Sequence, residues 1–354
     1  MTAKTVKVSI LLPSLNARKF LEPRVDSLRK QTFSDWEAIV LDSHSTDGSW
    51  DFFQSIAGTD PRFRLHQVPR EGLYAALNRG LELATGDLLY IAPIDDTMAP
   101  QFFAEMIEAL GRCLDAGVAV CDCLFINQDG RELLPQDMAA RLSKRKIRNL
   151  LKSGPVRTSL PAIRRHTVNY RPPPYDCLLH FTGRSVYFSL TQLLIRTTSA
   201  KAAGFFETDV SSAADFRWLV RLTSLTGSIH LPKRLATWRF HGDQLSLVRD
   251  NSRLGSMYEM CQKILPPLRQ RYPGLLTDND CELLLLPYKT ALARSIIRRL
   301  GYWFESFAHL CANFFRQPLA TLRIFFQTGI GKDFPVAIVL RRKKLVPREL
   351  EPIS

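Results

Sequence analysis

The fold of this chain is decided by residues 83–96, which read Leu83-Ala84-Thr85-Gly86-Asp87-Leu88-Leu89-Tyr90-Ile91-Ala92-Pro93-Ile94-Asp95-Asp96. An apolar run that ends in two carboxylates is typical of a buried strand that delivers acids at its C-terminal end, where open α/β sheets bind ligands. Oxygen ligands of this kind suit hard divalent cations that also bind phosphates. An isolated Asp-Asp pair more often forms a turn or a helix cap, so the neighbouring motifs must decide between these interpretations.

Strands and helices alternate around this stretch. The predicted strands are residues 8–12, 36–41 and 63–68 and the strand that ends at Asp95. The predicted helices among them are residues 21–28 and 72–84. This alternation predicts an α/β fold with a doubly wound, mostly parallel sheet and helices on both faces. Right-handed crossovers would bring Pro13, Asp42 and Asp95 to one edge of that sheet.

Five motifs follow one another in this part of the chain. They are Leu-Pro-Ser-Leu-Asn (12–16), Leu-Asp-Ser-His-Ser-Thr-Asp-Gly-Ser (41–49), Glu-Gly-Leu-Tyr-Ala-Ala-Leu-Asn-Arg-Gly (71–80), Ala-Thr-Gly-Asp (84–87) and Ile-Asp-Asp (94–96). Together, in this order and spacing, they resemble family 2 of the inverting nucleotide-sugar glycosyltransferases, whose fold is called GT-A. The resemblance covers roughly residues 6–246 and implies a GT-A-like sheet for them.

The resemblance implies roles for the matching positions. Asp42 would accept a hydrogen bond from the nucleotide base, and Asp95 would bind a divalent metal, Mn²⁺ or Mg²⁺. Such a cation would stabilise the negative charge that develops on the diphosphate leaving group. The chain departs from the family at Pro93, where many members carry an acid or Asn. The remaining nucleotide- or donor-binding positions would be Pro13, Ser14, Asn16, Asn78 and Arg79.

Ordinary structural roles remain open for several of these residues. Asp42 and Asp47 could simply cap a turn, and Asn78 could lie at the end of a helix together with the glycine that follows Arg79. We interpret His44, in the turn after Asp42, as solvated. Asp87 is interpreted as structural because it precedes the strand.

The candidate catalytic base lies in the middle of the chain. Residues 211–222 read Ser-Ser-Ala-Ala-Asp-Phe-Arg-Trp-Leu-Val-Arg-Leu, and Asp215 opens this predicted helix where the helix dipole favours an anion. The simple interpretation is a helix cap, whereas the resemblance implies the catalytic base. That base would take the proton of an acceptor hydroxyl as it attacks the anomeric carbon.

The resembling region closes with Thr-Trp-Arg-Phe-His-Gly-Asp-Gln-Leu-Ser (237–246). In related enzymes a His after the last core strand can ligate the metal, and His241 fits because imidazole can complete an oxygen-rich site. A phosphate contact or a structural role is equally open for His241. Arg239 is a candidate for supporting the pyrophosphate.

The charge of the chain is localised. The net charge is +14, but residues 141–171 hold ten Lys or Arg and no acid, and residues 251–354 hold sixteen Lys or Arg against eight acids. The rest of the chain is therefore net acidic, which argues against a nucleic-acid-binding protein. Seven scattered Cys indicate reduced thiols and a cytoplasmic setting. The first residues lack the basic and apolar pattern of a signal segment, so none is expected.

Three parts are expected from this organisation. Residues 1–100 would be the nucleotide-sugar-binding half, residues 101–250 the acceptor-binding half, and residues 251–354 a basic helical C-terminal extension. Within the second part, the basic segment 141–171 is either a solvated face or a loop that contacts an anionic acceptor or the donor diphosphate.

The C-terminal extension carries an apolar and aromatic stripe. It recurs at helical spacing over residues 296–315, and basic residues lie beside it and at 341–344. Glu305 and His309 interrupt it, which disfavours a transmembrane span. The stripe is either a core helix or an interfacial helix in peripheral contact with an anionic membrane at its inner face.

These observations predict a cytoplasmic, metal-dependent, inverting glycosyltransferase. It would move one sugar from a nucleotide-diphosphate sugar to a hydroxyl of a glycan or lipid-linked acceptor. The family resemblance alone implies the setting, which is surface polysaccharide or glycolipid synthesis. The alternative is a non-catalytic protein that binds nucleotide sugar or scaffolds a pathway; a nucleic-acid partner is not expected.

Overall fold

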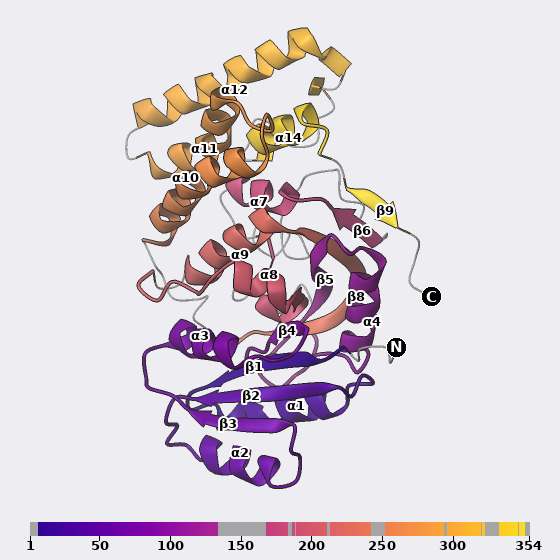
Figure 1. Cartoon of the computed structure of the whole chain (residues 1–354). Coiled ribbons are helices and arrows are strands. Elements are labelled where there is room, and N and C mark those ends of the chain that lie inside the picture. The colour runs from indigo at the N-terminus through magenta and orange to yellow at the C-terminus, as the bar shows by residue number, and fades with distance from the viewer. Residues whose placement is uncertain are drawn as a thin grey trace.

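The computed structural model describes residues 6–133, 168–182, 186–187, 189–210, 213–241, 252–293, 296–319, 321–322, 333–345 and 347–350. Within them, one nine-stranded sheet has the order β3-β2-β1-β4-β7-β5-β8-β6-β9 (Figure 1). Its strands are β1 (Val8–Ser14), β2 (Trp36–Asp42), β3 (Phe63–Gln67), β4 (Leu88–Ile91), β5 (Ala116–Ile126), β6 (Val168–Arg171), β7 (Leu193–Arg196), β8 (Gly227–Arg239) and β9 (Arg348–Leu350).

The predicted mostly parallel sheet is confirmed. Strands β1 to β4 are parallel to one another and β5 is parallel to β8, whereas β6 and β7 are antiparallel to every strand with which they pair, β9 included. Ser14 pairs with Asp42 and Leu11 with Ile91. The C-terminal ends of β1, β2 and β4 therefore meet at one edge of the sheet.

Helices cover both faces, as predicted. They are α1 (Arg18–Arg29), α2 (Ser49–Ala57), α3 (Leu73–Leu83), α4 (Phe102–Arg112), α7 (Tyr175–Leu179), α8 (Thr197–Ala202), α9 (Ala214–Leu225), α10 (Arg253–Arg271), α11 (Asp278–Leu292), α12 (Ile296–Arg316) and α14 (Asp333–Arg342), with the short 3₁₀ helices η1 (His180–Thr182) and η2 (Leu190–Gln192). Residues of α1 and α4 pack on one face of the sheet. Those of α3 and α9 pack on the other, in one core with residues of α10, α11 and α14.

The strand expected to end at Asp95 ends at Ile91 instead. Pro93 follows two residues later and has no N–H to donate to a neighbouring strand. The Asp96 N–H donates to the Pro93 carbonyl at 3.3 Å, so a turn begins there. The two carboxylates therefore belong to the loop after β4 rather than to the strand.

Helix α3 does not end at Asn78, because it continues to Leu83. Gly80 lies in its interior against the sheet: an added Cβ would come within 2.8 Å of Leu41 Cδ1 and 3.0 Å of Leu11 Cδ2. Glycine here allows the helix to lie close to β1 and β2. The possible helix end at this position is thereby excluded.

The basic segment 141–171 lies almost wholly outside the described residues, which resume at 168. The C-terminal helices form the outer layer of the molecule (Figure 1). No helix among the described residues has the length and apolar character needed to cross a bilayer.

Candidate functional site

The edge formed by β1 and β2 holds a buried carboxylate. Asp42 is fully buried at the end of β2, and its two oxygens accept hydrogen bonds from the Ser45 N–H at 2.9 Å and the Ser45 hydroxyl at 2.5 Å. Asp42 therefore caps the turn that follows, as its simple interpretation states. Beside it, the hydroxyl of Ser14 is buried and has no hydrogen-bond partner among the described residues.

The loops after β1 and β2 are bonded to each other. Asn16 has a left-handed backbone, with φ 49°, a conformation that Asn tolerates better than most residues. Its N–H donates to Ser45 Oγ at 2.9 Å, and its Oδ1 accepts from the Thr46 N–H at 2.8 Å. Asp47 accepts from the Arg18 N–H at 2.9 Å. The two loops thus form one bonded rim beside Asp42.

Asp95 and His241 meet in space although they lie far apart in sequence. Asp95 Oδ2 is 2.7 Å from His241 Nε2. The imidazole is 7% exposed and packs on Phe20, with ring centroids 5.0 Å apart. Its Nδ1 is buried without a hydrogen-bond partner among the described residues. A carboxylate oxygen and an imidazole nitrogen are therefore brought to one point at this edge of the sheet.

Arg239 holds the backbone around that point. Its Nε donates to the Asp95 carbonyl at 2.6 Å, and its Nη1 donates to the carbonyls of Asn127 at 3.2 Å and Gln128 at 2.9 Å. Burial lowers the pKa of Arg239, although the nearby carboxylates Asp96 and Asp95 oppose this effect. The guanidinium therefore joins the loop after β4 to the turn after β5.

Asp96 is a buried acid whose surroundings were not anticipated from the sequence. It accepts from the Arg239 N–H at 2.9 Å and from the Ser189 hydroxyl at 3.4 Å. Burial, and then the charge of Asp95, raise the pKa of Asp96 well above its ordinary value. The sequence feature that could have indicated a buried Asp96 is its position next to Asp95. Two adjacent residues in a turn point in different directions, so one acid can be buried while the other faces the site.

Asp215 lies in the first turn of α9, where Ala213 is the N-terminal cap residue. One of its oxygens accepts from the Phe216 N–H at 2.6 Å and lies 3.9 Å from Arg253 Nη2. The side chain is 33% exposed, so solvent or a ligand can reach it. Its backbone is hydrogen-bonded to the hydroxyl of Tyr74, a contact from α3 that the sequence did not reveal.

Asn78 and Arg79 of α3 take different positions. The Asn78 amide donates to the Phe206 carbonyl at 2.9 Å and accepts from the Phe206 N–H at 2.8 Å. Both polar atoms of the amide therefore bind the backbone of the same residue, which lies in the segment that leads to α9. Arg79 instead pairs with Glu71 at 2.5 Å on the surface. Through Tyr74 and Asn78, helix α3 is thus hydrogen-bonded to the first turn of α9 and to the segment that precedes it.

The donor set of Asp95 and His241 fits a divalent cation that is shared with a ligand. No cluster of three or more His, Cys, Asp or Glu side chains suited to a metal is found in the parts of the chain that the structure describes. Mg²⁺ in phosphate sites is held by one or two protein carboxylates together with substrate oxygens. Two protein ligands are therefore sufficient if a diphosphate supplies the others.

Residues 9–171 match the family model "Glycosyl transferase family 2". The "Putative glycosyltransferase EpsH" of Bacillus subtilis (strain 168) is 28% identical over 136 residues, which are 38% of this chain and 39% of that protein. The "PGL/p-HBAD biosynthesis glycosyltransferase Rv2957" of Mycobacterium tuberculosis (strain ATCC 25618 / H37Rv) is 36% identical over 91 residues, 25% of this chain and 36% of that protein. The chain thus spans less than two fifths of the length of these curated relatives.

Among solved structures, S. aureus TarS 1–349 in complex with UDP-GlcNAc superposes with a TM-score of 0.56 at 15% identity, covering 96% of this chain and 92% of that one. A likeness at this identity concerns the fold. The chain contains a glycosyltransferase family 2 domain with a GT-A-like fold, and the resemblance inferred from the five motifs is confirmed.

Proposed function

We propose that this domain is an inverting glycosyltransferase that moves a single sugar from a nucleotide-diphosphate sugar to an acceptor hydroxyl. The observation that carries the proposal is the 2.7 Å approach of Asp95 to His241 at the edge where β1 and β2 also end. The family match over residues 9–171 supports it. The name of the mycobacterial relative mentions PGL/p-HBAD biosynthesis, which favours a glycolipid or surface polysaccharide acceptor.

Asp95 and His241 would hold the cation, Mn²⁺ or Mg²⁺, and the donor diphosphate would complete its coordination. When bound, the cation supplies positive charge that stabilises the leaving diphosphate. Arg239 would act on this site by fixing the backbone of Asp95, since its guanidinium is already bonded to carbonyl oxygens.

The nucleotide would lie along the rim of β1 and β2, against Pro13, Ser14, Asn16 and Asp42. The hydroxyl of Ser14, which has no hydrogen-bond partner in the described part of the chain, is a buried polar atom that a ligand can satisfy. A base N–H would be taken up by Asp42, because each carboxylate oxygen has more than one lone pair and Ser45 uses only part of this capacity.

Arg79 would exchange its exposed partner Glu71 for the negative charge of the donor, because surface ion pairs are weak and easily replaced. Asn78 would contribute from further away. Its amide is hydrogen-bonded to the backbone of Phe206, in the segment that leads to α9. Asn78 would therefore position the edge of the sheet that binds the donor relative to Asp215.

Asp215 would be the catalytic base. It is accessible, lies in the first turn of α9 where the helix dipole favours the carboxylate, and is 3.9 Å from the cationic Arg253. It would remove the proton from the acceptor hydroxyl as that oxygen attacks the anomeric carbon. Attack on the face opposite the diphosphate inverts the configuration at that carbon.

The experiment that tests the cation site compares wild type with Asp95→Ala in donor hydrolysis and transfer, over a panel of nucleotide sugars with Mn²⁺ or Mg²⁺. We expect turnover to fall by roughly a hundredfold or more, as for other groups that stabilise developing charge. Asp51→Ala, an exposed acid of α2, serves as the control and should retain activity. Full wild-type activity in excess chelator would refute the metal assignment.

Asp215→Asn tests the base. This change keeps the shape of the side chain and removes its basicity, so donor binding should persist while transfer falls. The anomeric configuration of the wild-type product, measured by NMR, should be inverted; a retained anomer contradicts the mechanism. Wild-type protein that binds nucleotide sugar but neither hydrolyses nor transfers it would support the alternative, a non-catalytic binding or scaffold protein.

We further propose the division into a nucleotide-sugar half (1–100), an acceptor half (101–250) and a C-terminal extension (251–354), in a cytoplasmic protein. The buried residues that α10, α11 and α14 share with α3 and α9 support an extension that is continuous with the catalytic core.

A further inference from the structure

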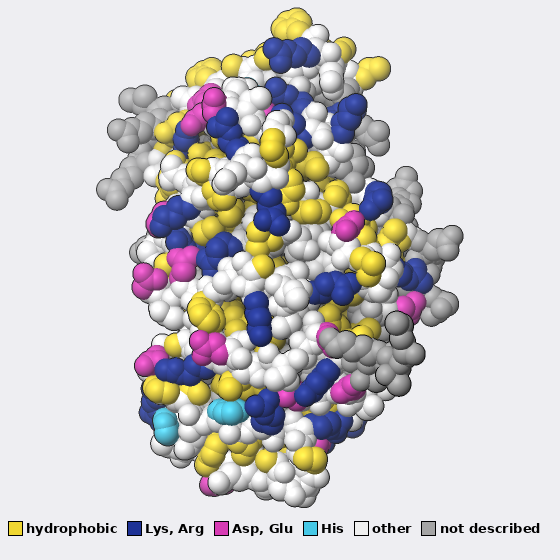
Figure 2. Space-filling view, in the orientation of Figure 1, with side chains coloured by type: hydrophobic (Ala, Val, Ile, Leu, Met, Phe, Trp, Pro, Cys, Tyr) yellow, Lys and Arg dark blue, Asp and Glu magenta, His cyan; other side chains and the backbone are white. Residues whose placement is uncertain are grey.

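Helix α12 carries most of its aromatic side chains on the side that faces away from the protein. Phe304 is 61% exposed, Phe315 is 85% exposed and Trp303 is 43% exposed. Tyr302 and Leu310 of the same helix are only partly exposed and pack against the core. Apolar side chains stand along the upper rim of the molecule, where α12 lies in Figure 1 (Figure 2). This arrangement is the reverse of the usual one, in which a surface helix turns its apolar side inward.

The exposed face is continuous along the helix. Its members on α12 recur at steps of three, four and seven residues between Leu300 and Phe315, so they lie on one side of the helix over about 24 Å. Contiguous exposed apolar surface of this kind marks an interaction site. The large apolar residues exposed on α12 and just beyond it are Leu300, Trp303, Phe304, Phe307, Phe314, Phe315, Leu319 and Leu322.

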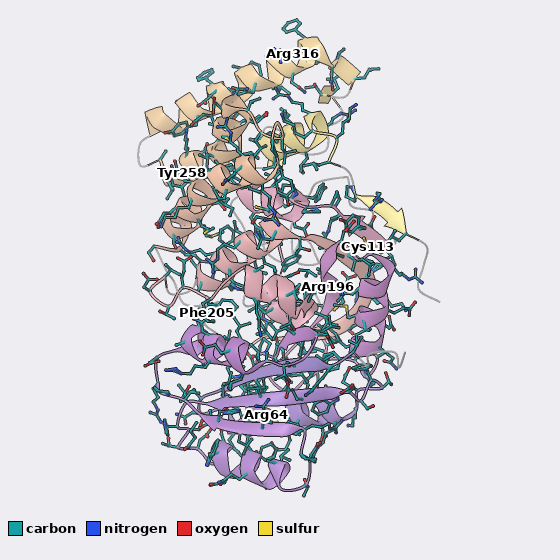
Figure 3. All side chains as sticks on the ribbon, viewed as in Figure 1. Arg64, Cys113, Arg196, Phe205, Tyr258 and Arg316 are labelled. Atoms are coloured by element: carbon teal, nitrogen blue, oxygen red, sulfur yellow. The ribbon has the colours of Figure 1, made fainter. Side chains whose placement is uncertain are left out.

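The sequence that contains this face is strongly basic. Residues 294–345 contain ten Lys or Arg and only two acids, Glu305 and Asp333. Part of this charge is used inside the protein, because Arg342 and Lys343 pair with the buried Asp280 at 3.3 Å and 2.9 Å. Arg316, however, is exposed at the outer end of α12 (Figure 3).

Charge and shape decide which partner fits. A second copy of this chain would bring an equally basic segment against the first, and like charges repel. A membrane span is excluded for the described helices. An amphipathic helix with aromatic residues on one face and basic residues around it suits the headgroup region of an anionic bilayer, with its axis in the membrane plane.

We propose that α12 binds the surface of an anionic lipid bilayer, with Trp303, Phe304 and Phe315 inserted among the acyl chains near the headgroups. This inference goes beyond sugar transfer. It concerns a surface that shares no residue with the Asp95–His241 site, so lipid binding and catalysis can each fail independently in experiments.

The test uses the full chain and two kinds of vesicle, pure phosphatidylcholine and phosphatidylcholine with roughly a third phosphatidylglycerol. We expect co-sedimentation with the anionic vesicles, little with the neutral ones, and weaker binding as salt is raised. Quenching of Trp fluorescence by brominated acyl chains should be lost in Trp303→Phe, which identifies the inserted side chain.

The double variant Phe304→Gln/Phe315→Gln should bind the anionic vesicles about tenfold or more weakly, since two apolar side chains no longer insert. Leu114→Gln removes an apolar residue that is 81% exposed elsewhere and should leave binding unchanged. Equal vesicle binding by wild type and the double variant overturns the proposal. So does a wild-type dimer in analytical ultracentrifugation that the double variant abolishes, because the partner is then a second copy.

Discussion

Helices α9 and α12 both carry an apolar, aromatic face, but this face is buried in α9 and exposed to solvent in α12. Both carry Trp, Phe and Leu at helical spacing. In α9, Trp218 is fully buried, its ring stacks on Phe206 at 4.5 Å, and its Nε1 donates to the Gly204 carbonyl at 2.8 Å. In α12, Trp303 stacks on Phe307 at 5.6 Å, but both rings are open to solvent.

The difference teaches what covers an apolar face. Helix α9 is enclosed by α7, α8 and α10, and its apolar residues are shared with the core of the sheet. Helix α12 packs mainly on α11 and contributes its other side to that contact. A periodic pattern thus predicts an apolar face, while the occupant of that face depends on the rest of the molecule or on a partner.

The largest effect should come from breaking the buried side of this comparison. Trp218→Ala removes a fully buried ring and leaves a cavity, so we expect the free energy of unfolding to fall by about 3–5 kcal/mol. Chemical denaturation measures this loss. Trp303→Ala on α12 is the matched control and should cost far less in the absence of lipid. Similar losses in the two variants would mean that α12 is covered by protein in solution.

A second contrast separates buried from exposed acids. Burial alone would raise the pKa of Glu37, but hydrogen bonds from Thr85 and Ser9, together with Arg64 and Lys7, lower it from 4.5 to about 2. The folded state therefore favours the charged form. The resulting stability is present above about pH 4.5 and is lost as the pH falls towards 2.

Glu37→Gln should accordingly lower the free energy of unfolding by about 2–3 kcal/mol at neutral pH. It should also flatten the loss of stability between pH 4.5 and 2, the window set by the unfolded and folded pKa values. Thermal unfolding of wild type and variant from neutral pH down to pH 2 measures both the loss at neutral pH and the flatter acid profile. Glu305→Gln, at an exposed position of α12, provides the control; a Glu37 variant with an unchanged acid profile contradicts the prediction.

The third prediction concerns how α9 is held in place. Asn78→Ala removes both hydrogen bonds to the Phe206 backbone, and leaves two polar groups unpaired. We expect the free energy of unfolding to fall by about 1–3 kcal/mol. If Asn78 positions Asp215, kcat for transfer should fall while the Kd for donor stays near the wild-type value. A weakened donor Kd with unchanged kcat would instead assign Asn78 to direct donor binding.

The smallest effect is expected on the exposed side. Phe304→Gln should change the free energy of unfolding by no more than about 0.5 kcal/mol without lipid, as is usual for surface substitutions. Denaturation of the purified chain, with and without anionic vesicles, measures it. A loss above about 2 kcal/mol in lipid-free buffer would show that Phe304 is part of a folded contact.

Much of the fold could be predicted from local pattern. Alternating strands and helices, and the five ordered motifs, indicated the mostly parallel sheet and its family. The predicted end of β4 was wrong because the apolar Ile94 was read as part of the strand. Pro93 has no N–H to donate to a neighbouring strand, and β4 ends at Ile91. Element existence depends on many residues, but a boundary depends on one or two hydrogen bonds.

The candidate site could be predicted only in part. Asp95 and His241 were assigned together to a metal from separate motifs, and they lie in contact; their metal role stays a prediction. The partners of Asn78 and Arg239 could not be read from the sequence, because both side chains bind backbone atoms of distant segments. Such atoms carry no signature in residue identity. The basic segment 141–171 was predicted as a separate feature and falls mostly on residues outside the described part.

The bonded rim formed by Asn16, Ser45 and Asp47 has a consequence for thermodynamics. These loops are fixed by hydrogen bonds to each other within the chain itself, so a molecule that binds there does not have to supply the contacts that order them. The conformational entropy that loop closure usually costs on binding is met during folding instead. Calorimetry of nucleotide binding should therefore report a heat-capacity change that reflects the buried ligand surface, without the additional contribution of a segment that folds on binding.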